Sequence, residues 1–299
     1  MLRNRVTRVA LDREYPSGVL ERVQQIETDM LAEIDRICRK HGLTYWIDGG
    51  TCLGAVRHKG FIPWDDDIDI GMPLEDYYKF ADLCETELPE GMIFVTPQNN
   101  PNMLVLWGKL CAEGTLFVER DAWEIGVREG IFIDVFPYIR LNKSKDHGYS
   151  QLKRTQRWAK INYIYRIKSP SVLENKRWKN VGLVAWRMAR AALHLISSPK
   201  RIARGFAKDC ACKDPSNWWG NPAAAHPYPF REDVLFEPVE LEFGELRVFA
   251  PHNWDSFLTD LYDDYMRLPA PEQRHTHTPY MLDLGDGKPI DLRNNAHEA

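Results

Sequence analysis

The segment Trp64-Asp-Asp-Asp-Ile-Asp-Ile70 constrains the fold more than any other part of the chain. Alternate side chains of a β-strand point to opposite faces, so Ile68 and Ile70 are expected to enter a core together. The carboxylates that share the other face are Asp65, Asp67 and Asp69. Three like charges this close repel each other unless a cation neutralises them, and an oxygen-rich site suits Mg²⁺. An acidic surface turn is the alternative interpretation.

A further carboxylate has a similar setting. Asp134 is the sole charge in the apolar, strand-like run Ile131–Pro137. A buried Asp costs several kcal/mol unless it is paired or bound to a metal. An adjacent strand that carries Asp134 beside Asp67 and Asp69 would complete a metal site. The alternative is an Asp that caps the turn before Pro137.

A glycine pair follows the predicted strand over residues 43–47, in the segment Asp48-Gly-Gly-Thr51. Paired glycines let backbone amides approach an anion, and the N-terminus of a following helix adds positive potential. A glycine pair alone is a weak signal, because most are only turns. Together with the carboxylates of the next strand, it predicts a site that holds phosphates and a metal.

Helical and strand patterns alternate along the chain. Helices are expected at 19–40, 52–58, 76–88 and 253–266, and strands at 43–47, 64–72, 93–96, 104–110, 115–119 and 131–136. A hairpin of residues 235–243 and 246–249 is expected around Gly244. The first helix has apolar residues at helical spacing and charges elsewhere. This mixture predicts an α/β (α+β) fold with a mixed sheet.

The chain divides into four predicted parts. Residues 1–139 form the catalytic core with its N-terminal helix, and 140–215 form a basic helical insertion. Residues 216–280 form a C-terminal subdomain of hairpin and helix that completes the catalytic domain. Residues 281–299 are polar and are expected to be a loose tail.

Charge is divided unevenly between these parts. The whole chain of 299 residues has a formal net charge of −4, but residues 140–208 contain 18 basic and 2 acidic residues. The remainder contains 21 basic and 41 acidic residues. This split predicts one surface that meets something anionic, although the stretch has no nucleic-acid recognition motif.

Two helices in the insertion are amphipathic. Lys153, Arg157 and Lys160 share one face opposite a second set of residues, Trp158, Ile161 and Tyr165. Later in the insertion, the apolar stripe consists of Val181, Ala185, Met188, Ala192 and Leu195. The opposite stripe consists of Arg187, Arg190 and His194. Such helices lie on an anionic bilayer, pack their apolar stripes on the catalytic domain with the cations in water, or form a channel for an anionic donor or acceptor.

The six cysteines form no disulfide framework, which is typical of a protein from a reducing compartment. Residues 1–20 lack the apolar core of a secretory signal, and no apolar run approaches roughly 18 residues. We therefore expect a cytoplasmic protein, with contact at the inner face of the membrane through residues 140–208 as an open alternative.

The segment from Gly49 through His58 and Trp64 to Gly71 resembles the signature of the LicD family, which includes phosphocholine transferases and the distant relatives fukutin and fukutin-related protein. Later segments also resemble that family: Phe132–Pro137, Glu242–Glu245, Leu261–Met266 and Arg274–His277. The resemblance covers roughly residues 20–280 and implies a nucleotidyltransferase-like fold. Asp263 departs from the pattern, because a glycine is common at its position. No family motif can be placed in residues 140–208, so acceptor choice stays open.

The resemblance implies a metal-dependent transferase that moves a phospho-alcohol from a CDP-activated donor to a hydroxyl of a cell-surface glycan, such as lipopolysaccharide, with release of CMP. Phosphocholine from CDP-choline is the preferred group. Phosphoethanolamine, ribitol phosphate and glycerol phosphate are alternatives within the family, and an NTP-using nucleotidyltransferase is an alternative outside it. An inactive relative that serves as a binding subunit is disfavoured, because all the acidic positions are present.

The resemblance also implies roles for particular residues. Asp67, Asp69 and Asp134 would hold Mg²⁺, or alternatively Mn²⁺, and Asp65 would be a ligand or the general base. The residues expected at the donor are Gly49, Gly50, Thr51, Arg57, His58, Lys109, Arg274, His275 and His277. A quaternary ammonium group would also bind favourably against aromatic rings, and Trp107 is one candidate.

Overall fold

The structure is a computed structural model that describes residues 15–100, 102–170, 179–224, 226–274 and 276–293. Its central sheet contains β1 (Trp46–Ile47), β2 (Ile68–Pro73), β6 (Phe132–Asn142), β4 (Gly108–Ala112) and β3 (Met92–Val95), in that order. Strands β2 and β6 are parallel, and the other neighbours are antiparallel. β7 (Pro215–Gly220) pairs with the far part of β6, and β8 (Phe230–Arg231) pairs with β7.

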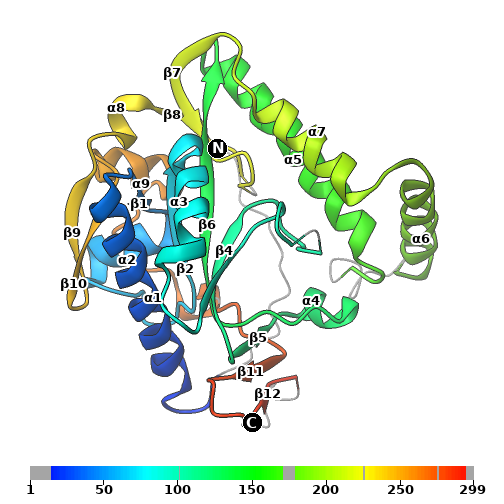
Figure 1. Ribbon diagram of the computed structural model, residues 1–299, viewed down its shortest axis with the longest axis horizontal. Helices are drawn as coiled ribbons and strands as arrows, with labels where there is room; N and C mark the ends of the chain where they lie inside the picture. The colour runs from blue at the N-terminus through cyan, green and yellow to red at the C-terminus, as the bar shows by residue number, and fades with distance from the viewer. Residues whose placement is uncertain (1–14, 101, 171–178, 225, 275, 294–299) are drawn as a thin grey trace.

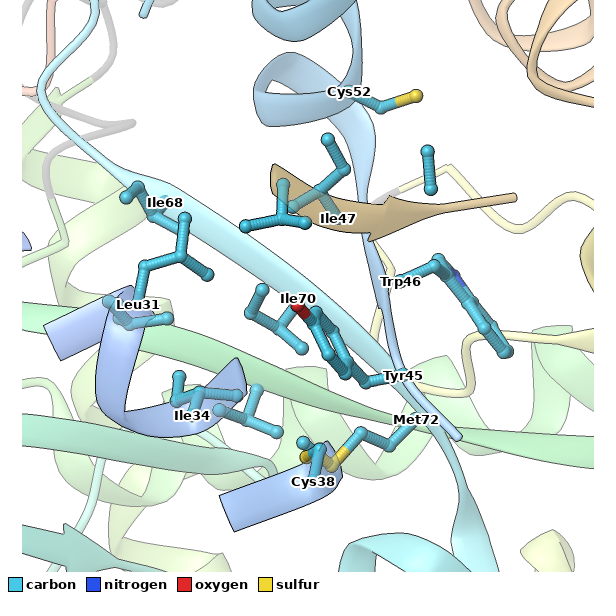
Figure 2. Packing of buried hydrophobic residues seen from close by; sticks show 14 of the residues in the cluster. Leu31, Ile34, Cys38, Tyr45, Trp46, Ile47, Cys52, Ile68, Ile70 and Met72 are labelled. Atoms are coloured by element: carbon cyan, nitrogen blue, oxygen red, sulfur yellow. The ribbon is translucent and has the colours of Figure 1, made fainter. Parts of the chain in front are cut away.

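The main core lies between this sheet and two helices, α1 (Val19–His41) and α3 (Leu74–Glu87) (Figure 1). Alternate residues of β2 enter it, so the isoleucines of the acidic segment are fully buried. Figure 2 shows the residues from α1 and β2 that meet there: Leu31, Ile34, Cys38, Ile68, Ile70 and Met72. The side chain of Asp69, which lies between the two isoleucines of β2, therefore faces the opposite side of the sheet.

Short elements pack at the β1 edge of the sheet. Helix α2 (Gly49–His58) follows β1 and contacts β2, α9 (Trp254–Tyr262) and the hairpin of β9 (Val239–Phe243) and β10 (Leu246–Ala250). Among the smaller elements, the helices are α4 (Arg120–Ile125), α8 (Glu232–Leu235) and the 3₁₀ turn Pro271–Gln273. The expected hairpin around Gly244 is confirmed, but residues 232–235 are helical.

A helical extension leaves the end of β6. It consists of α5 (Lys145–Arg166), α6 (Lys179–Ile196) and α7 (Pro199–Cys210), and Figure 1 shows α6 at its outer end, away from the sheet. Helices α5 and α7 pack together, and β7 returns the chain to β6. Among the described residues, no helix is long and apolar enough to cross a membrane.

Several expected boundaries are corrected. The strand expected over 64–72 begins only at Ile68, and Asp65 to Asp67 lie in the turn before it. The strand expected to end before Pro137 continues through it to Asn142. A proline fits an extended backbone where its missing N–H is not needed by the ladder, so it does not end β6.

The expectation of a loose tail over 281–299 is wrong for residues 281–293. β11 (Met281–Asp283) pairs with β5 (Leu116–Val118), and β12 (Ile290–Asp291) pairs with β11. Leu282 and Leu292 are fully buried against a second core that includes Phe117. Two leucines suffice to anchor an otherwise polar segment, because each removes its whole side chain from water.

These layers form the α+β, nucleotidyltransferase-like architecture that the sequence predicts: a mixed, curled sheet with helices on it. The sheet face opposite α1 carries the polar residues of the candidate site.

Candidate functional site

Three neighbouring strands place charged side chains in one row across the sheet. Asp69 of β2 is paired in register with Asp134 of β6, and Asp134 is paired with Lys109 of β4. The expected adjacency of Asp69 and Asp134 is thus present, because β2 and β6 are parallel neighbours. The apolar residues on either side of each of these positions face the main core, so this row occupies the opposite face.

The turn before β2 places the Asp65 side chain next to the glycine pair at the start of α2. A Cβ atom on Gly50 would lie 3.1 Å from Asp65 Oδ2, and one on Gly49 would lie 3.4 Å from Asp69 Oδ2. Gly49 also has φ +47°, in the left-handed region that favours glycine. The pair therefore leaves space in which two carboxylates approach the first turn of the helix.

Two side chains fix that first turn. Asp48 caps α2 by accepting the N–H of Gly49 at 2.8 Å, and the hydroxyl of Tyr138 donates to Asp48 at 2.8 Å. The amides of Gly50 and Thr51 also belong to the first turn, where a helix offers no acceptor. The Thr51 hydroxyl oxygen is buried and accepts the N–H of Asp69 at 2.8 Å, so in this structure it ties the helix to β2.

A compact group of possible metal ligands lies in the same turn. One ligand atom each from Asp65, Asp66, Asp67 and His277 falls within 4.8 Å of the others. Asp66 is almost fully buried and both its oxygens are engaged, by the hydroxyl of Tyr15 at 2.6 Å and the N–H of His277 at 2.8 Å. Asp66 therefore anchors the segment around His277 beside the site, a role that the sequence did not reveal.

The predicted metal set of Asp67, Asp69 and Asp134 is only partly the same as this group. Asp67 belongs to both, whereas Asp69 and Asp134 are not members of the compact group. The Asp134 carboxylate is held by the indole N–H of Trp107 at 2.7 Å and lies 3.8 Å from Lys109 Nζ.

Glu27 is a site residue that sequence reasoning missed. It projects from the buried face of α1, is 1% exposed, and has one carboxylate oxygen, Oε2, without a hydrogen-bond partner. Its pKa is raised well above the usual value by burial and by repulsion from Asp67, Asp66 and Asp65. The signal was present, because Glu27 lies four residues after Val23 and four before Leu31, on the apolar stripe where no charge was expected.

Burial and mutual repulsion raise the pKa values of several acidic residues in the site. Burial and repulsion from Asp67 raise the pKa of Asp65 to about 8, and burial raises the pKa of Asp69 well above its usual range. Burial also raises the pKa of Asp134 to about 6, although Lys109 acts in the other direction. Burial would raise the pKa of Asp67 too, but hydrogen bonding and attraction from His277 outweigh burial and lower it.

Basic side chains gather around Trp64, directly before the acidic turn; burial and the nearby Arg57 lower the pKa of His58. The Arg274 guanidinium lies 4.4 Å from the Trp64 ring centroid, and the His58 ring lies 6.4 Å from it. Arg57 donates to His58 Nε2 at 3.0 Å, and burial together with the nearby Arg274 lowers the pKa of Arg57. Among the described residues, neither guanidinium has a carboxylate partner. We call Arg57, His58 and Arg274 the basic group.

Lys109, His275 and His277 were also predicted to lie at the donor, and the structure describes two of them. The Lys109 ammonium is buried between Glu129 at 3.1 Å and Asp134, and it lies 3.2 Å from the centroid of the Phe132 ring. In this structure it therefore balances the charge of Asp134. His277 Nδ1 lies 3.3 Å from Asp67 Oδ2, whereas His275 is outside the described residues.

The donor set fits a hard divalent cation. It consists mainly of carboxylate oxygens, which Mg²⁺ and Mn²⁺ prefer. Buried carboxylates with raised pKa values hold protons where a cation would otherwise neutralise them. The unpartnered Oε2 of Glu27 points to the same conclusion, because buried polar atoms rarely lack partners.

The sheet, the glycine-led helix and the clustered carboxylates define a nucleotidyltransferase-like site. Residues 42–169 match the family model described as LicD/FKTN/FKRP, nucleotidyltransferase domain. The resemblance to the LicD family is thereby confirmed over this part of the chain.

Individual relatives agree with this assignment. The chain is 26% identical over 268 residues to the lipopolysaccharide cholinephosphotransferase LicD of Haemophilus influenzae, covering 86% of this chain and 95% of that protein. It is 57% identical over 35 residues to the human ribitol 5-phosphate transferase FKRP, covering 12% and 7%. It is 44% identical over 36 residues to the mouse ribitol-5-phosphate transferase FKTN, covering 12% and 8%. This homology supports a phosphotransferase enzyme.

Proposed function

We propose that this protein transfers phosphocholine from CDP-choline to a hydroxyl of a cell-surface glycan and releases CMP. The observation that carries the proposal is the placement of Asp65 and Asp69 against Gly49 and Gly50, with Asp134 in register beside Asp69. The likeness to a lipopolysaccharide cholinephosphotransferase over 86% of the chain supports choline as the alcohol.

Mg²⁺ is the proposed cofactor, held by Asp67, Asp69 and Asp134, with Mn²⁺ as an alternative. When bound, the ion would neutralise these carboxylates and polarise the phosphate oxygens of the donor. The Asp134 carboxylate is oriented for this by Trp107 and Lys109. The side chain of Asp66 serves as an anchor, because both of its oxygens are already engaged.

The first turn of α2 and the basic group are proposed to bind the donor. The Gly50 and Thr51 amides point out of the helix start, where anions bind well. Arg57 and Arg274, which have no carboxylate partner among the described residues, are suited to phosphate oxygens. Trp107 lies beside Asp134 and packs on Phe136 with ring centroids 5.2 Å apart, which supports an aromatic contact with the alcohol.

The acceptor hydroxyl oxygen would form a bond to the distal phosphorus of the donor, and the bond from that phosphorus to CMP would break. The hydroxyl proton would pass to Asp65, which lies against the glycine pair. A carboxylate with a raised pKa is a competent base near neutral pH.

The test is CMP release from CDP-choline with Mg²⁺ and a glycan acceptor. We expect Asp67→Asn to reduce the rate by at least about 10²-fold, because one charge that positions the cation is lost. Asp233→Asn, on an exposed side chain of α8 that pairs with Arg231, is the matched control and should retain activity. Near-normal CMP release by folded Asp67→Asn would contradict the assignment.

Donor choice separates the alternatives. The ribitol phosphate transferases among the relatives favour ribitol phosphate as the second candidate. Thermal shifts with CDP-choline, CDP-ethanolamine, CDP-ribitol and CDP-glycerol rank these alcohols directly. Release of pyrophosphate from an NTP, without CMP release from any CDP-alcohol, would instead establish a nucleotidyltransferase.

A further inference from the structure

Helix α6 turns its apolar side to solvent. Its large exposed side chains are Val181 (72% exposed), Val184 (56%), Met188 (69%), Leu195 (87%) and Ile196 (65%). Exposed alanines at 185, 189, 191 and 192 lie between them. At 100° per residue these positions form one continuous stripe about 160° wide, which we call the outer face of α6.

The opposite side of α6 is the side attached to the protein. The Trp186 indole N–H donates to the carbonyl of Ile167 at 2.9 Å, and its ring packs edge-on against Tyr163. The His194 ring stacks on Tyr165 with centroids 4.0 Å apart. The alternative in which the apolar stripe packs on the catalytic domain with the cations in water is therefore wrong for α6. On α5, Lys153, Arg157 and Lys160 are exposed, whereas Trp158 donates to Asp209 of α7 and Tyr165 stacks on His194 of α6.

The surroundings of the outer face are predominantly basic. Residues 179–210, which span α6 and α7, contain seven basic residues and one acidic residue, Asp209, whose carboxylate accepts the indole N–H of Trp158. The basic residues with exposed side chains are Arg187, Lys200, Arg201, Arg204 and Lys208. A second copy docked through the same face would bring like charges together, which is unfavourable. An anionic bilayer satisfies both features, because it accepts apolar side chains at its acyl boundary and cations among its headgroups.

We propose that α6 is an interfacial helix that docks this protein on the surface of an anionic bilayer. The outer face enters the boundary between headgroups and acyl chains, and the exposed cations of α7 contact the headgroups. The proposal is independent of the transferred group, because it concerns a surface at the far end of the extension from the carboxylates (Figure 1).

Flotation of the full chain with vesicles tests this docking. We expect the protein to float with vesicles of phosphatidylcholine and phosphatidylglycerol, and less with phosphatidylcholine alone or at high salt. Met188→Glu combined with Leu195→Glu should lower the bound fraction by at least about tenfold, because two apolar anchors become charged. The variant should fold normally, since both side chains are already in solvent.

Ile93→Glu is the matched control. Ile93 is 46% exposed on β3, an edge strand of the central sheet, so the same change there should leave flotation unaltered. Equal flotation of the double variant and the wild type would overturn the proposal. So would a wild type that stays unbound but forms a dimer in ultracentrifugation that the double variant abolishes, because a second copy would then cover the outer face.

Discussion

Asp69 has the most crowded electrostatic setting in the site. Burial and repulsion from Asp67, Asp134 and Asp48 raise its pKa well above the usual value. The unfolded state does not share this shift, so the contribution of Asp69 to the stability of the metal-free protein is most favourable at low pH and is lost as the pH rises towards the raised pKa of the folded state. A carboxyl proposed to act in the site is thus a liability for folding.

We therefore predict that Asp69→Asn stabilises the metal-free protein while abolishing transfer. The free energy of unfolding should rise by about 1 kcal/mol at pH 8, because the amide is not forced to hold a proton. The gain should shrink towards pH 5. Denaturant unfolding in EDTA at both pH values measures it, with Asp233→Asn as the exposed control; destabilisation at pH 8 would contradict the repulsion.

Proton competition at Asp65 gives a second prediction. The pKa of Asp65 is raised to about 8, so at pH 6 this carboxyl is protonated, and a cation must displace the proton or tolerate a neutral neighbour. The thermal shift produced by Mg²⁺ should therefore grow from pH 6 to pH 8 and level off above about pH 8. Melting curves with Mg²⁺ and with EDTA at each pH provide the comparison. A thermal shift that is independent of pH would indicate that Asp65 does not interact with the cation.

At the scale of single elements, helix α9 ends in an unusual conformation. Asp263, at its C-cap, has φ +57°, in the left-handed region that costs a residue with a Cβ. This explains why a glycine is common at the position in the family that the chain resembles. We predict that Asp263→Gly increases the free energy of unfolding by about 1 kcal/mol. Chemical denaturation measures the change, and Asp255→Gly inside the same helix should instead lower stability.

Strand β2 shows why part of the site was predictable. A period of two assigns Ile68 and Ile70 to one face and Asp69 to the other, and the parallel neighbour β6 then brings Asp134 alongside. The tight turn of Asp65 to Asp67 was not predictable, because its shape depends on contacts with Tyr15 and His277 that are distant in sequence.

Helix α6 shows a second limit. Periodicity established which residues share a face, and the structure retains that grouping. It could not decide which face meets the protein, because that choice depends on Trp186 and His194 finding Ile167 and Tyr165 on α5. Glu27 is a third case, since its place on an apolar stripe is visible in the sequence, but its nearness to Asp65, Asp66 and Asp67 is visible only in the structure.

At the scale of the whole molecule, the uneven charge has a structural basis. The carboxylates of the site lie on β2, on β6 and in the turn before β2, whereas the basic stretch is the helical extension, and β6 joins the two. Asp134 lies near the start of this strand, and α5 begins shortly after its end. A bilayer bound by α6 would therefore be connected to the site through α5, which contacts α6, and through β6, which carries Asp134.

The C-terminal strands are attached to the rest of the molecule by strand pairing and by apolar contacts. β11 joins β5, and Leu282 enters a core that also contains Val23 of α1 and Phe117 of β5. Residues far apart in the chain thus share one apolar cluster, so this cluster should unfold together with the central sheet.

We predict that Leu282→Ala lowers the free energy of unfolding by about 3 kcal/mol, because a fully buried leucine leaves a cavity on truncation. Unfolding should remain a single transition when followed by tryptophan fluorescence and by far-ultraviolet circular dichroism. Leu268→Ala, at a position 49% exposed, serves as the control and should change stability by less than about 1 kcal/mol. A negligible effect of Leu282→Ala would mean that the segment is an appendage, whereas a large effect makes it part of the fold that holds the acidic site.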